Sequence, residues 1–130
     1  MVCMRVPAYS SAAERADYWR ALAGVVRGTR EKRIVFVGDM NADPDSLRAA
    51  GGREMATLKA EGWQVPRAMG PWSYCSSRVQ SRIDHAIVSP NLVVDRAAYC
   101  PSVGDVTCAG NAAHLSDHAP LLVEISVPLS

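Results

Sequence analysis

Apolar residues recur with helical spacing near the start of the chain. Four of them stand at i, i+3, i+4 and i+7: Trp19, Leu22, Ala23 and Val26. The preceding Ser11-Ala12-Ala13-Glu14 has the pattern of a capping box, in which the serine side chain accepts from the N3 amide and the glutamate from the cap amide. Gly28 is a natural end for such a helix. The pattern therefore predicts a first helix between Ser11 and Gly28 with one buried face.

Short runs of β-forming residues alternate with this helix. Residues 34–37, Ile-Val-Phe-Val, are continuously apolar, which is typical of a strand buried on both faces. They end abruptly at Gly38-Asp39-Met40-Asn41. Strands are also expected in five other segments: residues 2–6, 72–75, 82–89, 93–99 and 120–127. A second helix is expected over residues 53–60, and residues 101–116 are expected to form one long loop.

The order strand, helix, strand, helix and then several strands indicates an α/β or α+β fold. At 130 residues the chain has room for one domain with one core. We expect one mixed sheet with helices on one face. No further element of the sequence is an evident cover for the other face.

Composition and charge narrow the class of protein only a little. The chain is 48% hydrophobic and 21% charged, which is ordinary for a folded soluble protein. No apolar run approaches the ~18 residues of a membrane span, so no membrane partner is expected. The net charge of +1 neither supports nor excludes a nucleic-acid partner, because a local basic patch is sufficient for binding.

The four cysteines have irregular spacing and form no C-x-x-C pair, which excludes the usual zinc patterns. Free thiols in a reducing compartment are expected, with a Cys100–Cys108 disulfide as the alternative. This favours an intracellular location, cytoplasmic or nuclear.

Three aspartates stand at expected strand ends. Asp39 follows a buried strand, Asp84 lies near the start of a strand, and Asp117 precedes the last one. Strand ends beside loops are where α/β sites are built. Each aspartate also has a plainer interpretation: a turn residue, a partner for Arg82 and a loop cap, respectively.

The residues next to these aspartates favour a catalytic role over the plainer interpretations. Asp39 and Asn41 are two apart and point the same way in an extended segment. Ser116-Asp117-His118 puts a hard oxygen ligand beside an imidazole, and Asp84 is a carboxylate that can orient that imidazole. Together these are the parts of a phosphodiesterase: oxygen ligands for Mg²⁺, an Asp/Asn pair to hold water and a carboxylate-backed histidine.

The motifs GDMN, SRIDH and LSDHAP, in this order, resemble the C-terminal half of the endonuclease/exonuclease/phosphatase superfamily, which includes DNase I, exonuclease III and the endonucleases of non-LTR retroelements. The segments AERADYWRALAGVV and SRIDHAIVSPNL are most similar to retroelement-type endonucleases. The resemblance implies the C-terminal half of a DNase I-like four-layer α/β sandwich. Residues 1–130 would then form a single partial domain that lacks the N-terminal half.

The resemblance also implies a role for each matching residue. Asp39 would polarise or deprotonate the attacking water, and Asn41 would hold water or phosphate. Asp117 would bind Mg²⁺ (or Mn²⁺), with Ser116 as its support. Asp84 would fix the tautomer of His118, which would stabilise charge on the phosphate.

Other residues near these motifs are weaker candidates. Trp72 and Tyr74 precede SRIDH, where an aromatic ring can stack on a base, although a half-buried sheet residue is the plainer interpretation. Arg5 stands where the family often has a histidine or tyrosine, and it can bind phosphate. We expect His85 to be a packing residue. His114 is interpreted as a solvated loop residue, with substrate contact as the alternative.

One principal metal ligand of the family, a strand glutamate, has no counterpart in the expected contexts of the glutamates, which are Glu14, Glu31, Glu54, Glu61 and Glu124. We therefore expect Mg²⁺-dependent phosphodiester hydrolysis, with DNA favoured, that is impaired in this chain. The alternative is a non-catalytic half-domain acting as an interaction or dimerisation module. Besides nucleic acid, the expected partners are a separate N-terminal half or a second copy. An unrelated α/β domain with coincidental motifs is the third interpretation.

Overall fold

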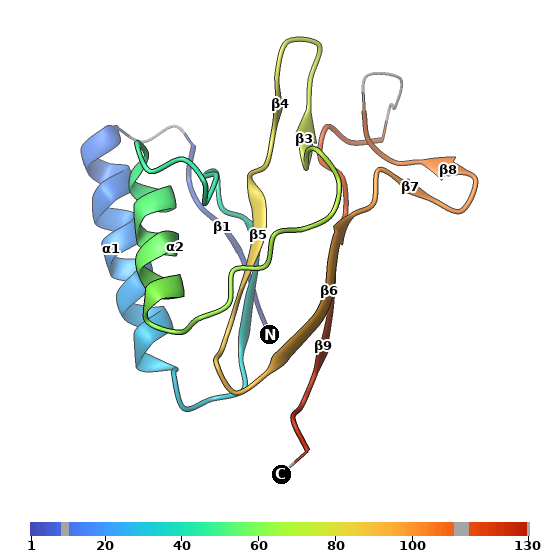
Figure 1. Ribbon diagram of the computed structural model, residues 1–130. Helices are drawn as coiled ribbons and strands as arrows, with labels where there is room; N and C mark the ends of the chain where they lie inside the picture. Colours follow the sequence, from blue (N-terminus) through green and yellow to red (C-terminus); the bar gives the residue numbers. More distant parts are fainter. Residues whose placement is uncertain (9–10, 111–114, 130) are drawn as a thin grey trace.

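The computed structural model describes residues 1–8, 11–110 and 115–129 of the chain (Figure 1). It has a layered α/β fold, which confirms the predicted class. The helices are α1 (Ala12–Gly28) and α2 (Ala50–Ala60). The strands are β1 (Val2–Arg5), β2 (Val35–Asp39), β3 (Tyr74–Cys75), β4 (Gln80–Ser81), β5 (Asp84–Val88), β6 (Val93–Tyr99), β7 (Ser102–Val103), β8 (Val106–Thr107) and β9 (Leu121–Ser126).

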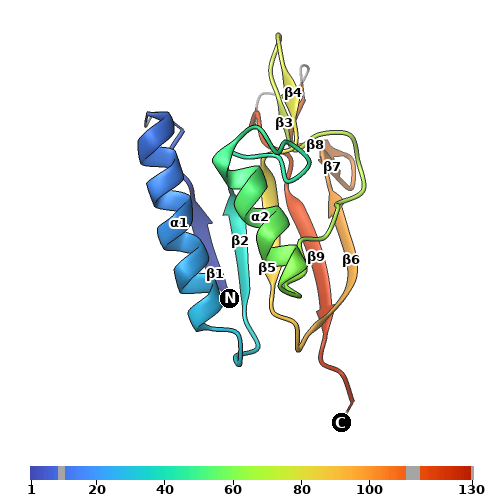
Figure 2. The ribbon, with the colours of Figure 1, turned by 60° about the vertical axis from the view of Figure 1, so that its left-hand side comes forward.

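The central sheet has the order β1-β2-β5, with β1 parallel and β5 antiparallel to β2. Both helices cover one face of this mixed sheet, as expected (Figures 1 and 2). The main core lies between the two helices and this face of the sheet. Its members come from α1, α2 and one face of the sheet, and include Trp19, Leu22, Val26, Met55, Leu58, Phe36 and Ile87.

The predicted start and apolar face of α1 are confirmed. Ser11 caps the helix: its hydroxyl accepts from the Glu14 amide at 3.2 Å, and the Glu14 carboxylate accepts from the Ser11 amide at 2.7 Å. The stripe that the spacing predicted is buried along its whole length: Trp19, Leu22, Ala23 and Val26. The helix ends at Gly28.

Helix α2 begins at Ala50, three residues before the expected start. The expectation was wrong because glycine is a poor helix former, so Gly51 and Gly52 argued against an earlier start. Packing overrides this preference. A Cβ on Gly51 would lie 2.6 Å from the Trp19 ring, and one on Gly52 would overlap the carbonyl of Ser46. These glycines let α2 approach α1 and its own preceding loop closely.

The expectation of a single sheet with one uncovered face needs correction. Strands β6 and β9 form a second, antiparallel sheet of two strands that lies over part of the other face of the central sheet (Figures 1 and 2). Between the two sheets is an apolar cluster built on Val35, Ala86, Val88 and Leu92, against which Val123 of β9 packs. The cover reaches β5 and β2.

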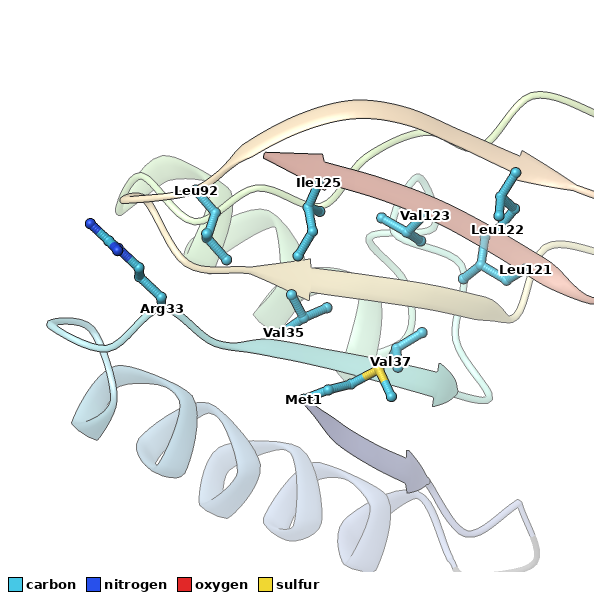
Figure 3. A pocket seen from close by; sticks show the side chains of 9 residues that line it. All are labelled: Met1, Arg33, Val35, Val37, Leu92, Leu121, Leu122, Val123 and Ile125. Carbon is cyan, nitrogen blue, oxygen red and sulfur yellow. The ribbon is translucent and has the colours of Figure 1, made fainter. Parts of the chain in front are cut away.

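Beyond this cover, the two sheets diverge around an apolar groove of about 400 Å³ (Figure 3). Val35 and Val37 of β2 face Val123 and Ile125 of β9 across it. Strands β1 and β9 are end strands of their sheets, so the described residues provide no neighbour for their outer edges. We call this hollow the intersheet groove. Its full lining is Met1, Arg33, Val35, Val37, Leu92, Leu121, Leu122, Val123 and Ile125.

Strand β2 runs two residues further than the apolar pattern indicated, through Gly38 to Asp39. Gly38 pairs with Met4 of β1 and has φ +147°, and a Cβ there would overlap the carbonyl oxygen of Met4. Only glycine therefore allows the two strands to pair this far. The extension places Asp39 within the sheet, opposite Asp84.

The expected long loop over residues 101–116 contains a small hairpin instead. Strands β7 and β8 pair across Gly104, which has φ +57°. The four cysteines are free thiols, so the alternative Cys100–Cys108 disulfide is not formed. Within the described ranges, neither helix has the length and apolar character needed to cross a membrane.

Candidate active site

Asp39 and Asp84 lie opposite each other on β2 and β5, as register partners at the same end of the central sheet. Because side chains alternate along a strand, Asp39 shares its face with Val35 and Val37, which line the intersheet groove. Both carboxylates are largely buried, with 15% and 14% of the side chain exposed. The polar end of an otherwise apolar sheet face is thus where the predicted site residues gather.

His118 completes a close pair with Asp84. Its Nδ1 lies 2.8 Å from Asp84 Oδ2, and 31% of its side chain is exposed. A carboxylate can only accept, so Nδ1 carries the hydrogen of this bond. The other ring nitrogen, Nε2, is left as the atom that can meet a substrate oxygen. The sequence predicted this contact between residues 34 positions apart.

Arg5 and Asn41 extend the site towards β1. Arg5 pairs with Asp39 across the strands, with Nε 3.6 Å from Oδ2, while its side chain remains 73% exposed. The backbone amide of Asn41 donates to Asp39 Oδ1 at 3.0 Å, and its side chain donates to the Val6 carbonyl at 2.6 Å. Asn41 therefore ties the end of β1 to the turn after β2, and it has φ +45°. Its carboxamide oxygen is the atom that suits the predicted role of holding water.

Asp117 and Ser116 lie on the loop that enters β9, and both are exposed. The Asp117 carbonyl accepts from the Cys75 amide at 2.9 Å, and the Ser116 hydroxyl accepts from the His118 amide at 3.0 Å. Ser116 thus shapes the turn that carries both Asp117 and His118. The expected support of Asp117 at a metal ion stays a prediction.

Mg²⁺ requires several well-placed hard oxygen ligands. Asp117 offers the hard oxygen that the ion prefers. Among the residues that the structure describes, however, no group of three or more His, Cys, Asp and Glu side chains is placed to hold a metal. The ligand chemistry therefore fits, and the number of protein ligands falls short. The glutamates do not supply the missing ligands. Glu14 accepts from the Ser11 amide, and Glu54 and Glu61 pair with Arg27. Glu31 lies in an exposed turn and Glu124 lies on β9.

The two aromatic candidates have different surroundings. The Tyr74 ring meets the His118 ring edge-on, with centroids 5.2 Å apart, so it belongs to the site. Trp72 packs against the cluster of Ala68, Ala97, Tyr99, Ala109 and Ala119 and is half-buried. Trp72 is thus a half-buried packing residue, as in the plainer interpretation, but it lies two residues before β3 and not in the expected strand over residues 72–75.

A hollow of about 580 Å³ lies beside the pair of Asp84 and His118. Val37 and Leu121 line both this hollow and the intersheet groove, so the two hollows adjoin each other. Its remaining lining is Cys3, Met4, Gly38, Asp84, Cys108, Leu115, Ser116, His118, Ala119 and Pro120. A substrate phosphate could thus reach the His118 ring from an open side.

The structure places His85 as expected, on the helix-covered side of the sheet. It is buried, and its Nε2 lies 2.7 Å from the Arg82 carbonyl, to which it donates. Burial lowers the pKa of His85, although the Arg82 carbonyl and the charge of Asp43 act in the opposite direction. His85 is therefore a neutral packing residue. His114 lies outside the described residues.

Sequence patterns did not single out Ser73 and Tyr99, which also contact the site. Ser73 accepts from the Asp84 amide at 3.0 Å, and Tyr99 donates to the Asp84 carbonyl at 2.9 Å. The Arg82 guanidinium lies 5.1 Å from the centre of the Tyr99 ring. These contacts join segments far apart in the chain, and no short motif reports them.

Comparison with known proteins agrees with this geometry. A search of curated proteins found no match. The sequence model of the Endonuclease/Exonuclease/phosphatase family matches residues 2–118, which include GDMN, SRIDH and the Ser116-Asp117-His118 triplet. Members of that family hydrolyse phosphodiester or other phosphate-ester bonds and typically depend on divalent metal ions. The chain therefore belongs to the endonuclease/exonuclease/phosphatase family.

Proposed function

We propose that this domain hydrolyses phosphodiester bonds of nucleic acids, with DNA favoured, and that it uses Mg²⁺ or Mn²⁺. The observation that carries the proposal is the 2.8 Å contact between His118 and Asp84, directly beside Asp39. The pair is accessible, because 31% of the His118 side chain is exposed and both residues line the hollow of about 580 Å³. The resemblance of residues 81–92 to retroelement endonucleases favours DNA as substrate.

The residues divide the work as follows. Asp39 orients the attacking water and takes its proton, with Asn41 holding the same water or a phosphate oxygen. Asp84 keeps the Nδ1 hydrogen of His118 in place, so that Nε2 faces the scissile phosphate. As negative charge grows on the phosphoryl oxygens, His118 stabilises it. Arg5 contributes a guanidinium that can bind a flanking phosphate.

Tyr74 lies against His118 and supplies an aromatic edge or face near the substrate, where a base can stack. Asp117 would hold the metal ion, which when bound neutralises charge on the phosphate and on the leaving oxygen. Mg²⁺ is often held by one or two carboxylates with water and phosphate oxygens. A single carboxylate ligand therefore binds Mg²⁺ weakly. We propose that these 130 residues alone are inactive or nearly so.

The test is a nicking assay on supercoiled plasmid DNA with the purified chain, in Mg²⁺ and in Mn²⁺. We expect a trace of activity at most, close to that of the Asp117→Ala variant, and none with a chelator. A Mg²⁺-dependent rate well above that control would contradict the proposed impairment and support the chemistry. If the wild-type chain does nick DNA above that control, an equal rate for His118→Ala would contradict the assignment of the site.

A second function is favoured by the intersheet groove. Among the described residues, an apolar hollow of about 400 Å³ lies between two end strands, whose unpaired edges can accept a further strand or apolar side chains. As an alternative we propose a non-catalytic interaction module, which binds a second copy or a separate polypeptide that supplies the N-terminal half of the domain. Concentration-dependent dimerisation without any metal binding would favour this module over the enzyme.

A further inference from the structure

Ser73 is completely buried next to the site, one residue before β3. Its hydroxyl oxygen accepts hydrogen bonds from two consecutive backbone amides, that of Ile83 at 2.9 Å and that of Asp84 at 3.0 Å. A buried serine that serves two amides of another segment restricts the backbone of that segment. Here the restricted segment is the one from which the Asp84 side chain projects.

The need for such a residue follows from the sheet order. Strand β5 is an end strand of the central sheet, so its outer edge has no strand neighbour there. At the Val88 end, Gln64 provides backbone partners, with bonds of 2.8 and 2.9 Å. At the Asp84 end, the Ser73 side chain takes this role. Without it, two partly buried amides would lose their acceptor, which is costly.

Ser73 also holds the segment that carries His118. Its backbone carbonyl accepts from the Ala119 amide at 2.7 Å, and two residues on, the Cys75 amide donates to the Asp117 carbonyl at 2.9 Å. His118 lies between these two bonds. One residue therefore contacts the backbones on both sides of the contact between Asp84 and His118: its hydroxyl binds one segment and its carbonyl binds the other.

Tyr99 adds a contact from the second sheet. Its hydroxyl donates to the Asp84 carbonyl at 2.9 Å. Burial raises the pKa of Tyr99, while the nearby Arg82 charge and Ser73 act in the opposite direction. Ser73 and Tyr99 thus bind the Asp84 backbone at two points, its amide and its carbonyl.

From this geometry we infer that Ser73 is a positioning residue, which keeps Asp84 at bonding distance from the His118 ring. The inference rests on the proposed function, in which that pair faces the phosphate. It assigns Ser73 no contact with substrate. It implies that Ser73 controls which ring nitrogen of His118 carries the hydrogen, because that choice follows from the position of Asp84.

The chain offers a matched control. Ser89 is equally buried, stands just after the other end of β5, and accepts from the Ile34 amide at 3.1 Å while donating to Asn91 at 2.7 Å. Ser73→Ala and Ser89→Ala each delete one fully buried hydroxyl at an end of the same strand. A general loss of stability will affect both variants.

The experiment is NMR on the ¹⁵N-labelled full chain, which requires no enzymatic activity. In Ser73→Ala we expect amide exchange at Ile83 and Asp84 to accelerate by about tenfold or more, with Ala119 protected as before. The His118 ring ¹⁵N shifts should move towards a mixture of tautomers. In Ser89→Ala these ring shifts should match the wild type.

Unchanged His118 ring shifts in a folded Ser73→Ala variant would overturn the inference, as would equal changes in the two variants. If Ser73→Ala does not fold, Ser73→Thr retains the hydroxyl and should keep the wild-type ring shifts, and altered shifts would overturn the inference. Tyr99→Phe, which keeps the ring, should shift His118 less than Ser73→Ala does. A failed nicking assay would affect the proposed function and leave these measurements interpretable.

Discussion

His85 and Asp84 are adjacent in the chain and lie in opposite environments. Asp84 faces the site and binds His118, while His85 is buried on the helix side and donates to the Arg82 carbonyl. Strand alternation separates them, and that alternation is readable from sequence. The consequence is that only one of these two neighbours takes part in the proposed chemistry. The other makes a contribution to stability that depends on pH.

Burial lowers the pKa of His85 below its ordinary 6.5. In the unfolded chain the imidazole takes a proton as the pH falls through 6.5, whereas in the folded chain it stays neutral to lower pH. The unfolded state then binds more protons, so the free energy of unfolding falls. The contribution is fully present above about pH 6.5 and is lost below it, by at most about 1.4 kcal/mol per pH unit.

Urea unfolding at pH 7.5 and 5.5 checks this prediction for the wild type and for His85→Gln. The glutamine amide can still donate to the Arg82 carbonyl and does not titrate. We expect the wild type to lose more stability than the variant between the two pH values. Parallel losses would show that another group causes the pH dependence.

Residues of the site differ in how far sequence revealed them. The contact of His118 with Asp84 was predicted, since motif order and a resemblance both pointed to it. The Asn41 bond to the Val6 carbonyl was not, because it depends on β1 lying beside β2. Ser73 was missed for the same reason: its partners are ten and eleven positions away in sequence and meet it only across the folded chain.

Among the elements, α1 has the clearest sequence signals for its start and for its buried face. Its capping box joins Ser11 and Glu14 in both directions, and an N-cap serine typically contributes about 1 kcal/mol. We therefore expect Ser11→Ala to lower the free energy of unfolding by about that amount, as measured by urea titration. Ser11→Asp retains an acceptor for the Glu14 amide and should remain close to the wild type. Equal losses in both variants would mean that the cap itself does not stabilise the helix.

The elements that sequence misjudged share a cause. The start of α2 was placed too late because helix propensity disfavours Gly51 and Gly52. Packing requires them: Trp19 and Ala42 leave no room for a larger residue at Gly51, and the Ser46 carbonyl leaves none at Gly52. The β7–β8 hairpin was taken for loop because each strand has only two residues. Val103 and Val106 flanking Gly104-Asp105 were the signal for a tight turn.

At the scale of the whole molecule, the intersheet groove predicts association. Ile125 lines it and is 44% exposed, while Val103 lies on the β7–β8 hairpin outside the groove and is 59% exposed. We expect the chain to self-associate at high concentration in sedimentation experiments without metal. Ile125→Lys should weaken this association about tenfold or more, because a charge would have to be buried in an apolar hollow.

Val103→Lys is the matched control, with the same change of charge on an exposed apolar residue. It should associate like the wild type. A chain that stays monomeric at all concentrations would argue against a second copy as the partner. A polypeptide that carries the N-terminal half would then be the remaining expected partner of the groove.

The pairing of β1 with β2 bears on how the motif GDMN is understood. Its glycine touches neither Asp84 nor His118 in the contacts described above, and its task is to let the Met4 carbonyl pass close to the backbone. The glycine in this motif is thus required by a strand that lies more than thirty positions upstream in the sequence. Displacing that first strand would remove the clash with Met4, but an alanine at this position would still be strained by the φ of +147°, so the backbone and the neighbouring strand each require glycine before the aspartate.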